Sequence, residues 1–246
     1  VTVTHSNYPP AISFGTSRYV KLLGNGDPAH KYGFYVGGTG GGASGVSVDG
    51  KSSDVELAYI EVTKTGFAGI MVKDDNAPQE QPGFVMENII IHHNFVHDTE
   101  GEGLYLGQTQ LATIAHEIRN VLIHNNIFVR TGWEGFQVSN LVGNVEVRNN
   151  VVYDCGRANI RWQNNAVQIM GNTFGNFHHN IIAKAKGNLL NGIGTGINFH
   201  HNYLEDAGEL AIWANDDWNG KTYFGPQAKD PNNMTKVYAN YIRKVN

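Results

Sequence analysis

The stretch Asn88-Ile89-Ile90-Ile91-His92-His93-Asn94 contains the phrase that decides the fold of this chain. An aliphatic or aromatic residue is followed by two polar residues and then by Asn. The copies are Ile91-His92-His93-Asn94, Ile123-His124-Asn125-Asn126, Val147-Arg148-Asn149-Asn150, Phe177-His178-His179-Asn180, Phe199-His200-His201-Asn202 and a weaker Val237-Tyr238-Ala239-Asn240. A phrase that returns in this way indicates a repeat architecture.

The spacing of the repeated Asn residues favours strands over helices. Successive Asn residues lie 32, 24, 30, 22 and 38 positions apart. A solenoid of helix pairs would keep a steadier period, whereas a β-helix joins short strands by loops of free length. The segment Asn120–His124 also alternates between apolar and polar residues, which is the pattern of a strand.

A second phrase follows each Asn and predicts a second strand in every coil. It consists of Gly or Ala, an apolar residue, any residue and an aliphatic residue. The apolar residues at its second and fourth positions should point inward. Examples are Gly69-Ile70-Met71-Val72, Gly103-Leu104-Tyr105-Leu106, Gly135-Phe136-Gln137-Val138, Ala166-Val167-Gln168-Ile169 and Ala211-Ile212-Trp213-Ala214. The sequence therefore predicts a parallel β-helix of roughly seven to eight coils.

Stacking of the coils makes residues that are distant in sequence into neighbours. Adjacent strands lie about 4.8 Å apart, so equivalent side chains come directly above one another. We expect the Asn residues to form an internal ladder, because Asn tolerates left-handed backbone angles and its amide can bond the next amide in the stack. The expected members are Asn94, Asn126, Asn150, Asn180 and Asn202, and their role is structural.

The chain is expected to form one β-helix domain over residues 1–246. Residues 1–52 should hold an irregular start and the first coils, and residues 53–246 the regular coils. Inserts between strands should project to one side and shape a cleft; they are expected at Lys73–Gly83, Gln108–Glu117, Arg157–Asn164 and Asp216–Met234. The last repeat ends at Asn246 and would expose strand edges, so we expect further coils or another domain to cover it.

Composition limits the partners and the compartment. The 246 residues are 41% hydrophobic and only 16% charged, with 30 Gly, which suits many short strands and tight turns. A net charge of −4 provides no overall attraction for nucleic acid. No apolar run approaches the roughly 20 residues that cross a bilayer. The single cysteine, Cys155, excludes an internal disulfide and fits a small buried residue.

The repeats resemble those of the right-handed β-helix superfamily that includes the pectin lyase-like proteins. The best-matching stretches are Asn88–Asn94, Thr99–Leu104 and Thr131–Phe136, within a similarity that covers roughly residues 53–245. The resemblance implies a secreted or surface protein that acts on or binds polysaccharides. The polygalacturonase motifs Asn-Thr-Asp, Gly-His-Gly and Arg-Ile-Lys are absent, as is the Asp-Pro-His of alginate epimerases. The resemblance therefore specifies the fold and no catalytic residue.

Two glutamates are the candidate catalytic residues. Alignment of the second phrase places Glu102 over Glu134, with Asn165 next. Repulsion and partial burial would raise the pKa of one carboxyl, which gives an acid and base pair or a cation site. Their separation would decide the stereochemistry of a hydrolase. Turn-capping carboxylates in solvent are the alternative interpretation.

A row of outward residues on the second strand is the candidate glycan-binding surface. Amides bond sugar hydroxyl groups, and aromatic rings stack on sugar C–H faces. The expected binding residues are Tyr105, Gln137, Gln168 and Trp213, with Trp133 and Trp162 nearby on the inserts. Ordinary packing beneath the inserts is the alternative.

A column of cationic and titratable residues follows the first phrase. His92, His124, Arg148, His178 and His200 should point outward, one on each coil. Imidazoles that lie one coil apart repel when protonated, so their pKa values should fall. The column could grip an acidic polysaccharide or bind zinc, copper or nickel; neutral stacked rings on a polar face fit equally well.

Acidic inserts are the candidate metal ligands. Asp74, Asp75, Asp216 and Asp217 offer the oxygen ligands that calcium prefers, although Asp is also a common turn residue. No other cofactor is indicated.

Two hypotheses of different classes follow from these residues. In the first, the chain is a secreted or cell-surface β-helix that binds a polysaccharide and cleaves it as a lyase or glycoside hydrolase. In the second, it is a non-catalytic structural or adhesion module of a larger surface protein, fibre or filament. Aligned carboxylates, amides and aromatic residues favour the first, and the absent catalytic motifs favour the second.

Overall fold

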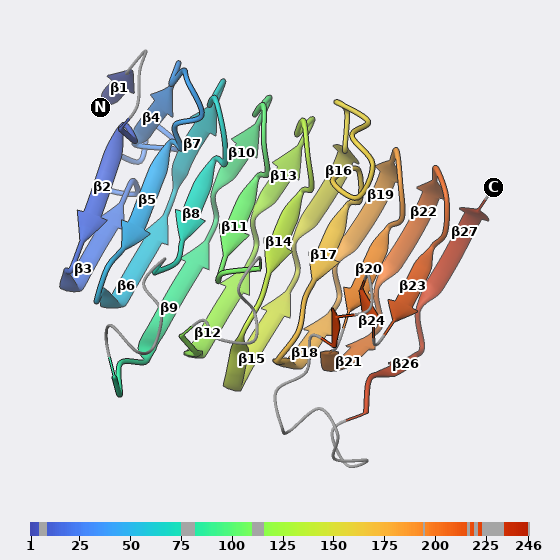
Figure 1. The fold of residues 1–246 in the computed structure, drawn as a ribbon. Helices are drawn as coiled ribbons and strands as arrows, with labels where there is room; N and C mark the ends of the chain where they lie inside the picture. Colours follow the sequence, from blue (N-terminus) through green and yellow to red (C-terminus); the bar gives the residue numbers. More distant parts are fainter. Residues whose placement is uncertain are drawn as a thin grey trace.

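The computed structural model describes residues 1–4, 9–74, 82–109, 116–193, 195–215, 217–218, 221–222 and 234–245. All regular elements within these ranges are strands, and all but one short pair belong to three parallel sheets (Figure 1). The chain visits the three sheets in a fixed rotation, so each full turn of the chain adds one strand to each sheet. The prediction of an all-β parallel β-helix is therefore confirmed, and eight strands in the third sheet correspond to eight coils.

The three sheets are named A, B and C here. Sheet A consists of β1 (Thr2–Thr4), β4 (Phe34–Gly37), β7 (Ile60–Thr63), β10 (Phe95–His97), β13 (Ile127–Val129), β16 (Val151–Cys155), β19 (Ile181–Ala185), β22 (Tyr203–Ala207) and β27 (Tyr241–Val245). Sheet B consists of β2 (Ile12–Gly15), β5 (Val46–Asp49), β8 (Ile70–Val72), β11 (Leu104–Leu106), β14 (Phe136–Val138), β17 (Val167–Ile169), β20 (Leu190–Ile193) and β23 (Ile212–Asn215). Sheet C consists of β3 (Arg18–Leu23), β6 (Ser53–Ala58), β9 (Met86–His92), β12 (Ile118–His124), β15 (Leu141–Arg148), β18 (Thr173–His178), β21 (Thr195–His200) and β26 (Lys236–Tyr238). The antiparallel pair is β24 (Asp217–Trp218) and β25 (Lys221–Thr222).

The first and second phrases of the repeat form sheets C and B in the expected register. Ile123 pairs with Ile91 on one side and with Val147 on the other, and Phe136 pairs with Leu104 and Val167. The sequence did not indicate sheet A as a separate strand. Its strands follow the ladder Asn directly and some contain only three residues, as in Phe95–His97, which is too short to show an alternation.

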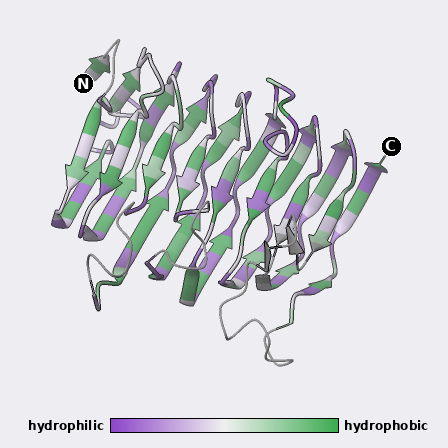
Figure 2. Ribbon diagram, viewed as in Figure 1, coloured by the Kyte–Doolittle hydropathy of each residue, from purple (hydrophilic) through white to green (hydrophobic). Residues whose placement is uncertain are grey.

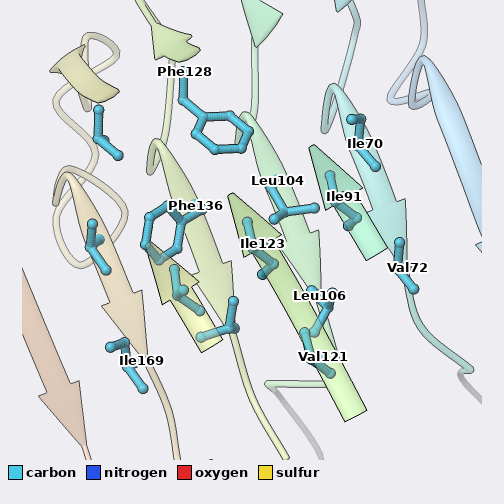
Figure 3. Packing of buried hydrophobic residues seen from close by; sticks show 14 of the residues in the cluster. Ile70, Val72, Ile91, Leu104, Leu106, Val121, Ile123, Phe128, Phe136 and Ile169 are labelled. Carbon is cyan, nitrogen blue, oxygen red and sulfur yellow. The ribbon is translucent and has the colours of Figure 1, made fainter. Parts of the chain in front are cut away.

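The core is one column of aliphatic and aromatic side chains that runs the length of the coils (Figure 3). Each sheet contributes its inward residues, and the hydrophobic bands recur along the strands (Figure 2). Phe128 and Phe136 pack edge to face in this column with ring centroids 6.0 Å apart. Cys155 is buried there as expected, and burial raises the pKa of its thiol to about 12.

The Asn ladder is confirmed and extends to Asn240. The Asn126 side-chain oxygen accepts hydrogen bonds from the Asn94 backbone N–H at 3.1 Å and from the Asn94 amide at 3.0 Å. The Asn126 amide donates to Ile91 O and to the Asn150 side-chain oxygen. The same pattern continues through Asn150, Asn180 and Asn202 to Asn240.

The expected backbone conformation of the ladder residues was wrong by one position. The left-handed angles belong to the residue before each ladder Asn, namely His93, Asn125, Asn149, His179, His201 and Ala239, with φ between 52° and 57°. This shift has a physical reason. The preceding residue makes the bend, so the ladder Asn points inward, where its amide reaches both the coil below and the coil above.

A second corner, between sheets A and B, carries stacked charges of alternating sign. One residue on each coil has a left-handed backbone there, and these residues are Lys64, Asp98, Arg130, Asp154, Lys184, Asp206 and Lys244. Arg130 donates two hydrogen bonds of 2.7 Å to Asp98, and Lys184 pairs with Asp154 at 3.4 Å. The Arg130 guanidinium, followed by the His97 ring, holds the pKa of Asp98 well below its usual range. The alternation favours the native register, because a slip by one coil would bring like charges together.

We expect Arg130→Glu to destabilise the protein by about 1–2 kcal/mol, because it replaces an attractive stack by three adjacent acidic residues. Urea unfolding in low and high salt measures the effect. The loss should shrink in high salt, since these groups are partly exposed and salt screens them. Arg130→Gln removes only the attraction and serves as the control. A loss that is equal for both variants would contradict the electrostatic account.

Described insert residues lie at both ends of the sheet B strands. Gln108 and Thr109 follow β11 on the way to sheet C, and the insert Arg157–Asn164 precedes β17 on the way from sheet A.

Candidate functional site

The outward residues of sheet B line up over successive coils as the sequence predicts. Met71, Tyr105, Gln137, Gln168, Asn191 and Trp213 are partners in the strand pairing. Tyr105, Gln137 and Gln168 are each only 5% exposed, and the described insert residues Thr109, Trp162 and Gln163 lie beside them. The expected open strip is therefore a covered pocket.

The pocket has a volume of about 300 Å³, at the lower end of the range for ligand sites. Glu102, Tyr105, Trp133, Gln137, Trp162 and Gln168 line it, together with Phe67, Thr109, Gln163 and Met170. The structure thus brings together six of the eight residues that the sequence suggested for catalysis or glycan binding. Trp213 lies beside the pocket and stacks on Trp162 with ring centroids 5.7 Å apart.

Aromatic rings form two walls of the pocket. Phe67 and Trp133 occupy equivalent positions in the turn before sheet B, two coils apart, and meet edge to face at 5.5 Å. They can meet because the coil between them has Gly101, where a Cβ would come within 3.0 Å of the Phe67 ring and backbone. The opposite wall is Trp162, which comes from the insert and has an unusual φ of 72° for a bulky residue.

A polar floor connects the pocket residues. The Tyr105 hydroxyl and the Thr109 hydroxyl are 2.8 Å apart, and the Gln137 amide donates to Thr109 at 2.8 Å. The Gln168 side-chain oxygen accepts hydrogen bonds from Asn165 and Asn191. Lys73 Nζ lies 4.8 Å above the Tyr105 ring. The floor therefore presents fixed amides and hydroxyls of the kind that orient a polar ligand.

Four lining residues were missed by the sequence analysis. Phe67 could have been found, because it holds the position of Trp133 in an earlier copy of the turn. Thr109 and Gln163 lie on inserts that follow no repeat, so no sequence signal marks them. Met170 follows β17 directly and carries no distinguishing pattern.

The two glutamates stack on neighbouring coils as expected. Gly69 N–H donates to Glu102 O at 2.8 Å, and Gly103 N–H donates to Glu134 O at 3.0 Å, which fixes the two turns one above the other. Both side chains are buried, with Glu102 at 1% and Glu134 at 0% exposure. Glu102 lines the pocket, whereas Glu134 is fully buried behind it and is not a lining residue. Glu102 alone is placed to touch a ligand.

Burial raises the pKa of both carboxyls. The pKa of Glu102 rises to about 7 because of burial, and the Lys73 charge offsets part of the rise. The pKa of Glu134 is raised well above its usual value by burial and then by the neighbouring Glu102. Within the described ranges, neither oxygen of Glu134 has a partner with good hydrogen-bond geometry. Both residues are therefore neutral acids in mildly acidic solution.

The same column shows what a purely structural side chain does at this turn. Asn165 accepts a hydrogen bond from Asn188 N–H at 3.0 Å, and Asn188 accepts one from Leu210 N–H at 3.0 Å. These amides form a short second ladder. Glu102 and Glu134 occupy equivalent positions, and among the described residues Glu102 Oε2 and both Glu134 oxygens have no partner with good hydrogen-bond geometry.

The histidine column lies on sheet C, away from the pocket, and its rings stack. The rings of His92 and His124 are 4.9 Å apart with planes inclined by 7°, and those of His178 and His200 are 5.0 Å apart with planes inclined by 4°. Burial, followed by charged neighbours, lowers the pKa of His200, and burial is also the main cause that lowers the pKa of His124. The expected direction of the shift is confirmed for these two members of the column.

The candidate metal ligands do not assemble into a site in the part of the chain that the structure describes. Asp74 is buried, and its carboxylate lies 3.8 Å from His116 Nε2. Asp75 and Asp216 lie outside the described residues, and the side chain of Asp217 is also not described. Among the described residues, no group of three or more His, Cys, Asp or Glu side chains could hold a metal ion. Parallel rings also direct their nitrogen lone pairs side by side, so the stacked imidazoles do not converge on one ion.

The fold and the pocket define the class of protein: a parallel β-helix with a ligand-sized pocket on one sheet. The family model described as "Right handed beta helix region" matches residues 29–204, and the chain belongs to this family. A search of curated proteins finds no match. No helix in the described ranges has the length and apolar character needed to cross a membrane.

Proposed function

We propose that this protein binds a polysaccharide at the sheet B pocket and hydrolyses it with Glu102 as the acid. The observation that carries the proposal is the Glu102 carboxyl, which faces an aromatic-walled pocket with a pKa of about 7. A carboxylic acid that is still protonated near neutral pH is suited to donate a proton to a leaving oxygen. The compartment that fits such a substrate is the cell surface or the surrounding medium.

Different pocket residues are expected to contact different parts of the sugar. Trp133 and Trp162 offer ring faces to the apolar faces of a sugar ring. Gln137 and Gln168 supply amides for its hydroxyl groups, and Tyr105 holds the floor through Thr109. Trp213 extends the platform beyond the pocket by its stack on Trp162.

In the proposed hydrolysis, Glu102 acts first as an acid and then as a base. The Glu102 carboxyl gives its proton to the glycosidic oxygen as the bond to the anomeric carbon breaks. A water molecule adds to that carbon, and its proton returns to the Glu102 carboxylate. Glu134 does not line the pocket and is not expected to touch the sugar; its neighbour Glu102 raises the pKa of Glu134.

We expect Glu102→Gln to lower the rate of glycan cleavage at least a hundredfold while glycan binding persists. Release of reducing ends from a panel of neutral and acidic glycans measures the rate, and absorbance of unsaturated ends detects lyase chemistry instead. In the wild type, the rate should fall as the pH rises through about 7, because Glu102 then loses its proton.

Two further variants complete this test. Glu100→Gln is the matched control, since Glu100 is an exposed carboxylate two residues away on the same turn. Trp133→Ala should weaken binding, as measured by affinity electrophoresis in each glycan. No product from any glycan with the wild type, together with binding that Trp133→Ala leaves unchanged, would refute the proposal.

The second candidate is a non-catalytic structural or adhesion module. Its support is the uninterrupted Asn ladder, together with the apolar and aromatic side chains that β26 and β27 expose, including Val237, Tyr238, Tyr241 and Ile242. A rigid stack with such a face is suited to pack against further β-structure. This candidate predicts that pocket variants change neither glycan binding nor any product.

A further inference from the structure

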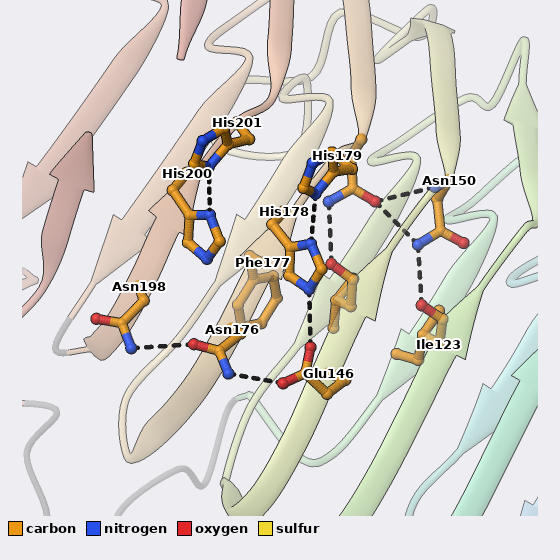
Figure 4. Close-up of polar contacts among 12 residues, drawn as sticks. Ile123, Glu146, Asn150, Asn176, Phe177, His178, His179, Asn198, His200 and His201 are labelled. Atoms are coloured by element: carbon orange, nitrogen blue, oxygen red, sulfur yellow. Dashed lines mark hydrogen bonds and ion pairs between the residues drawn. The ribbon is translucent and has the colours of Figure 1, made fainter. Parts of the chain in front are cut away.

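The edge of sheet C carries a straight row of imidazoles that the pocket chemistry does not use. We call His92, His93, His124, Arg148, His178, His179, His200 and His201 the histidine strip. Its members sit one coil apart, with parallel rings 4.9–5.3 Å apart in the pairs His92–His124, His178–His200 and His179–His201. His179 and His201 are exposed, and the others are partly buried. Figure 4 shows one end of the strip.

Hydrogen bonds determine which nitrogen of each ring carries the proton. His178 Nε2 lies 2.8 Å from the Glu146 carboxylate, which can only accept, so this nitrogen is the donor (Figure 4). In a neutral ring the other nitrogen, Nδ1, is then an acceptor. It lies 2.6 Å from His179 Nδ1, so His179 donates there. His179 Nε2 is therefore left with a lone pair.

The same arrangement occurs once more at His92, and a different one leaves a free lone pair at His124. His92 Nε2 lies 3.0 Å from the Glu56 carboxylate and His92 Nδ1 lies 2.8 Å from His93 Nδ1, which leaves the lone pair on His93 Nε2. His124 Nδ1 lies 2.8 Å from the Asn125 side-chain oxygen, which leaves the lone pair on His124 Nε2. A proton can therefore be added to each of these rings without breaking the hydrogen bonds that hold it.

The charged groups around the strip make protonation unfavourable in the free protein. Burial is the main cause that lowers the pKa of His93, His124 and His200, and neighbouring histidines also lower each of them. Lys31 acts on His93 and Arg148 on His124, both in the same direction. When these rings are protonated, their positive charges repel one another.

The strip also has acidic and aromatic neighbours. Glu56 and Glu146 are the carboxylates that face it, and Glu56 is also neutralised by Lys21 at 2.7 Å. The strip ends on aromatic rings. Tyr59 stacks on His93 at 5.0 Å, and Tyr238 stacks on His200 at 4.8 Å. A bound anion would relieve the repulsion between the histidines, and so it would promote their protonation.

We propose that the histidine strip is a second binding site, which takes up protons and binds a linear anionic polysaccharide in acidic solution. A chain with regularly repeated acidic groups can lie along the stack and place a charge beside each coil. This proposal does not depend on the function proposed for the sheet B pocket.

The test uses dextran sulfate and carboxymethyl dextran as probes, with neutral dextran as the control, at pH 5.0 and pH 7.5. The variant is the triple change His93→Asn, His179→Asn and His201→Asn. Asn is native at the equivalent positions 125 and 149 with the same left-handed φ, so the turn should be kept. At position 179 the introduced Asn amide N–H can donate to His178 Nδ1 in place of the His179 ring.

We expect the wild type to bind both anionic probes at least tenfold more tightly at pH 5.0 than at pH 7.5. Calorimetry in buffers of different ionisation enthalpy should show proton uptake. The triple variant should bind about tenfold more weakly at pH 5.0, since three rings that can take up a proton are lost. The control variant His30→Asn removes a histidine outside the strip and should bind as the wild type does.

Several outcomes would overturn this proposal. They are equal affinity at both pH values, binding that the triple variant leaves intact, and tighter binding of a single-stranded oligonucleotide than of dextran sulfate. Trp133→Ala separates the two sites, because it alters the pocket and leaves the strip unchanged. Loss of anionic binding in Trp133→Ala would assign that binding to the pocket.

Discussion

Asn150→Ala should destabilise the protein by roughly 4 kcal/mol. The Asn150 side chain makes four hydrogen bonds: it accepts two from Asn126 and donates one each to Ile123 O and Asn180. Asn150 and Asn126 are buried to 1% exposure or less, so water cannot replace the lost bonds. Each buried polar group that loses its partner costs about 1–3 kcal/mol.

Two neighbouring positions provide matched controls for this prediction. Asn149→Ala truncates an exposed Asn at the bend and should cost about 1 kcal/mol, because Ala239 natively occupies the equivalent position at φ 52°. Asn240→Ala removes the last ladder residue, which is partly exposed, and should cost less than Asn150→Ala. Urea unfolding followed by circular dichroism measures all three. Similar losses for Asn149→Ala and Asn150→Ala would show that the ladder bonds do not dominate.

Glu102→Gln should stabilise the protein by about 3 kcal/mol above pH 7 and change its stability little below pH 4.5. The sign follows from the pKa of Glu102, which burial raises from 4.5 to about 7. In the unfolded chain the carboxyl loses its proton near pH 4.5, whereas in the folded protein it keeps it up to about pH 7. The folded state therefore binds more protons in this window, and stability falls as the pH rises through it. Gln does not titrate, so the variant does not lose this stability as the pH rises.

The measurement is the difference in unfolding free energy between Glu102→Gln and wild type at pH 4.5 and at pH 8. Taking the difference removes the contribution of the histidines. The lowered pKa values of His93, His124 and His200 make both proteins lose stability as the pH falls below about 6.5. Glu100→Gln, at an exposed carboxylate, should show no such difference. A Glu102→Gln variant that is no more stable at pH 8 than at pH 4.5, relative to wild type, would refute the buried-acid account.

These two predictions together separate structural from functional residues. Loss of the Asn150 amide should weaken the fold, whereas loss of the Glu102 charge should strengthen it. Asn165 and Asn188 show that the turn of Glu102 accepts a side chain that bonds the next coil. A residue that lowers stability where a stabilising alternative fits is expected to serve binding or catalysis, as proposed for Glu102.

The sequence by itself determined which residues stack. The recurring phrases, and not a constant spacing, set the register of the coils, because each copy of a phrase lies above the copy before it. The Asn ladder, the pairing of Ile91 with Ile123, the stacked glutamates and the aligned Tyr105, Gln137 and Gln168 all follow from that rule.

The tertiary structure decided how deep these residues lie and what faces them. The sequence did not predict sheet A, because a three-residue strand is too short to show an alternation of apolar and polar residues. Glu102 and Glu134 follow one pattern and both are buried, but only Glu102 lines the pocket. Thr109, Gln163 and Trp162 reach the pocket from inserts, whose paths depend on packing against neighbouring coils and not on a repeat. The register of the coils can be read from the repeated residues. The burial of a pocket side chain also depends on insert residues, which follow no repeat.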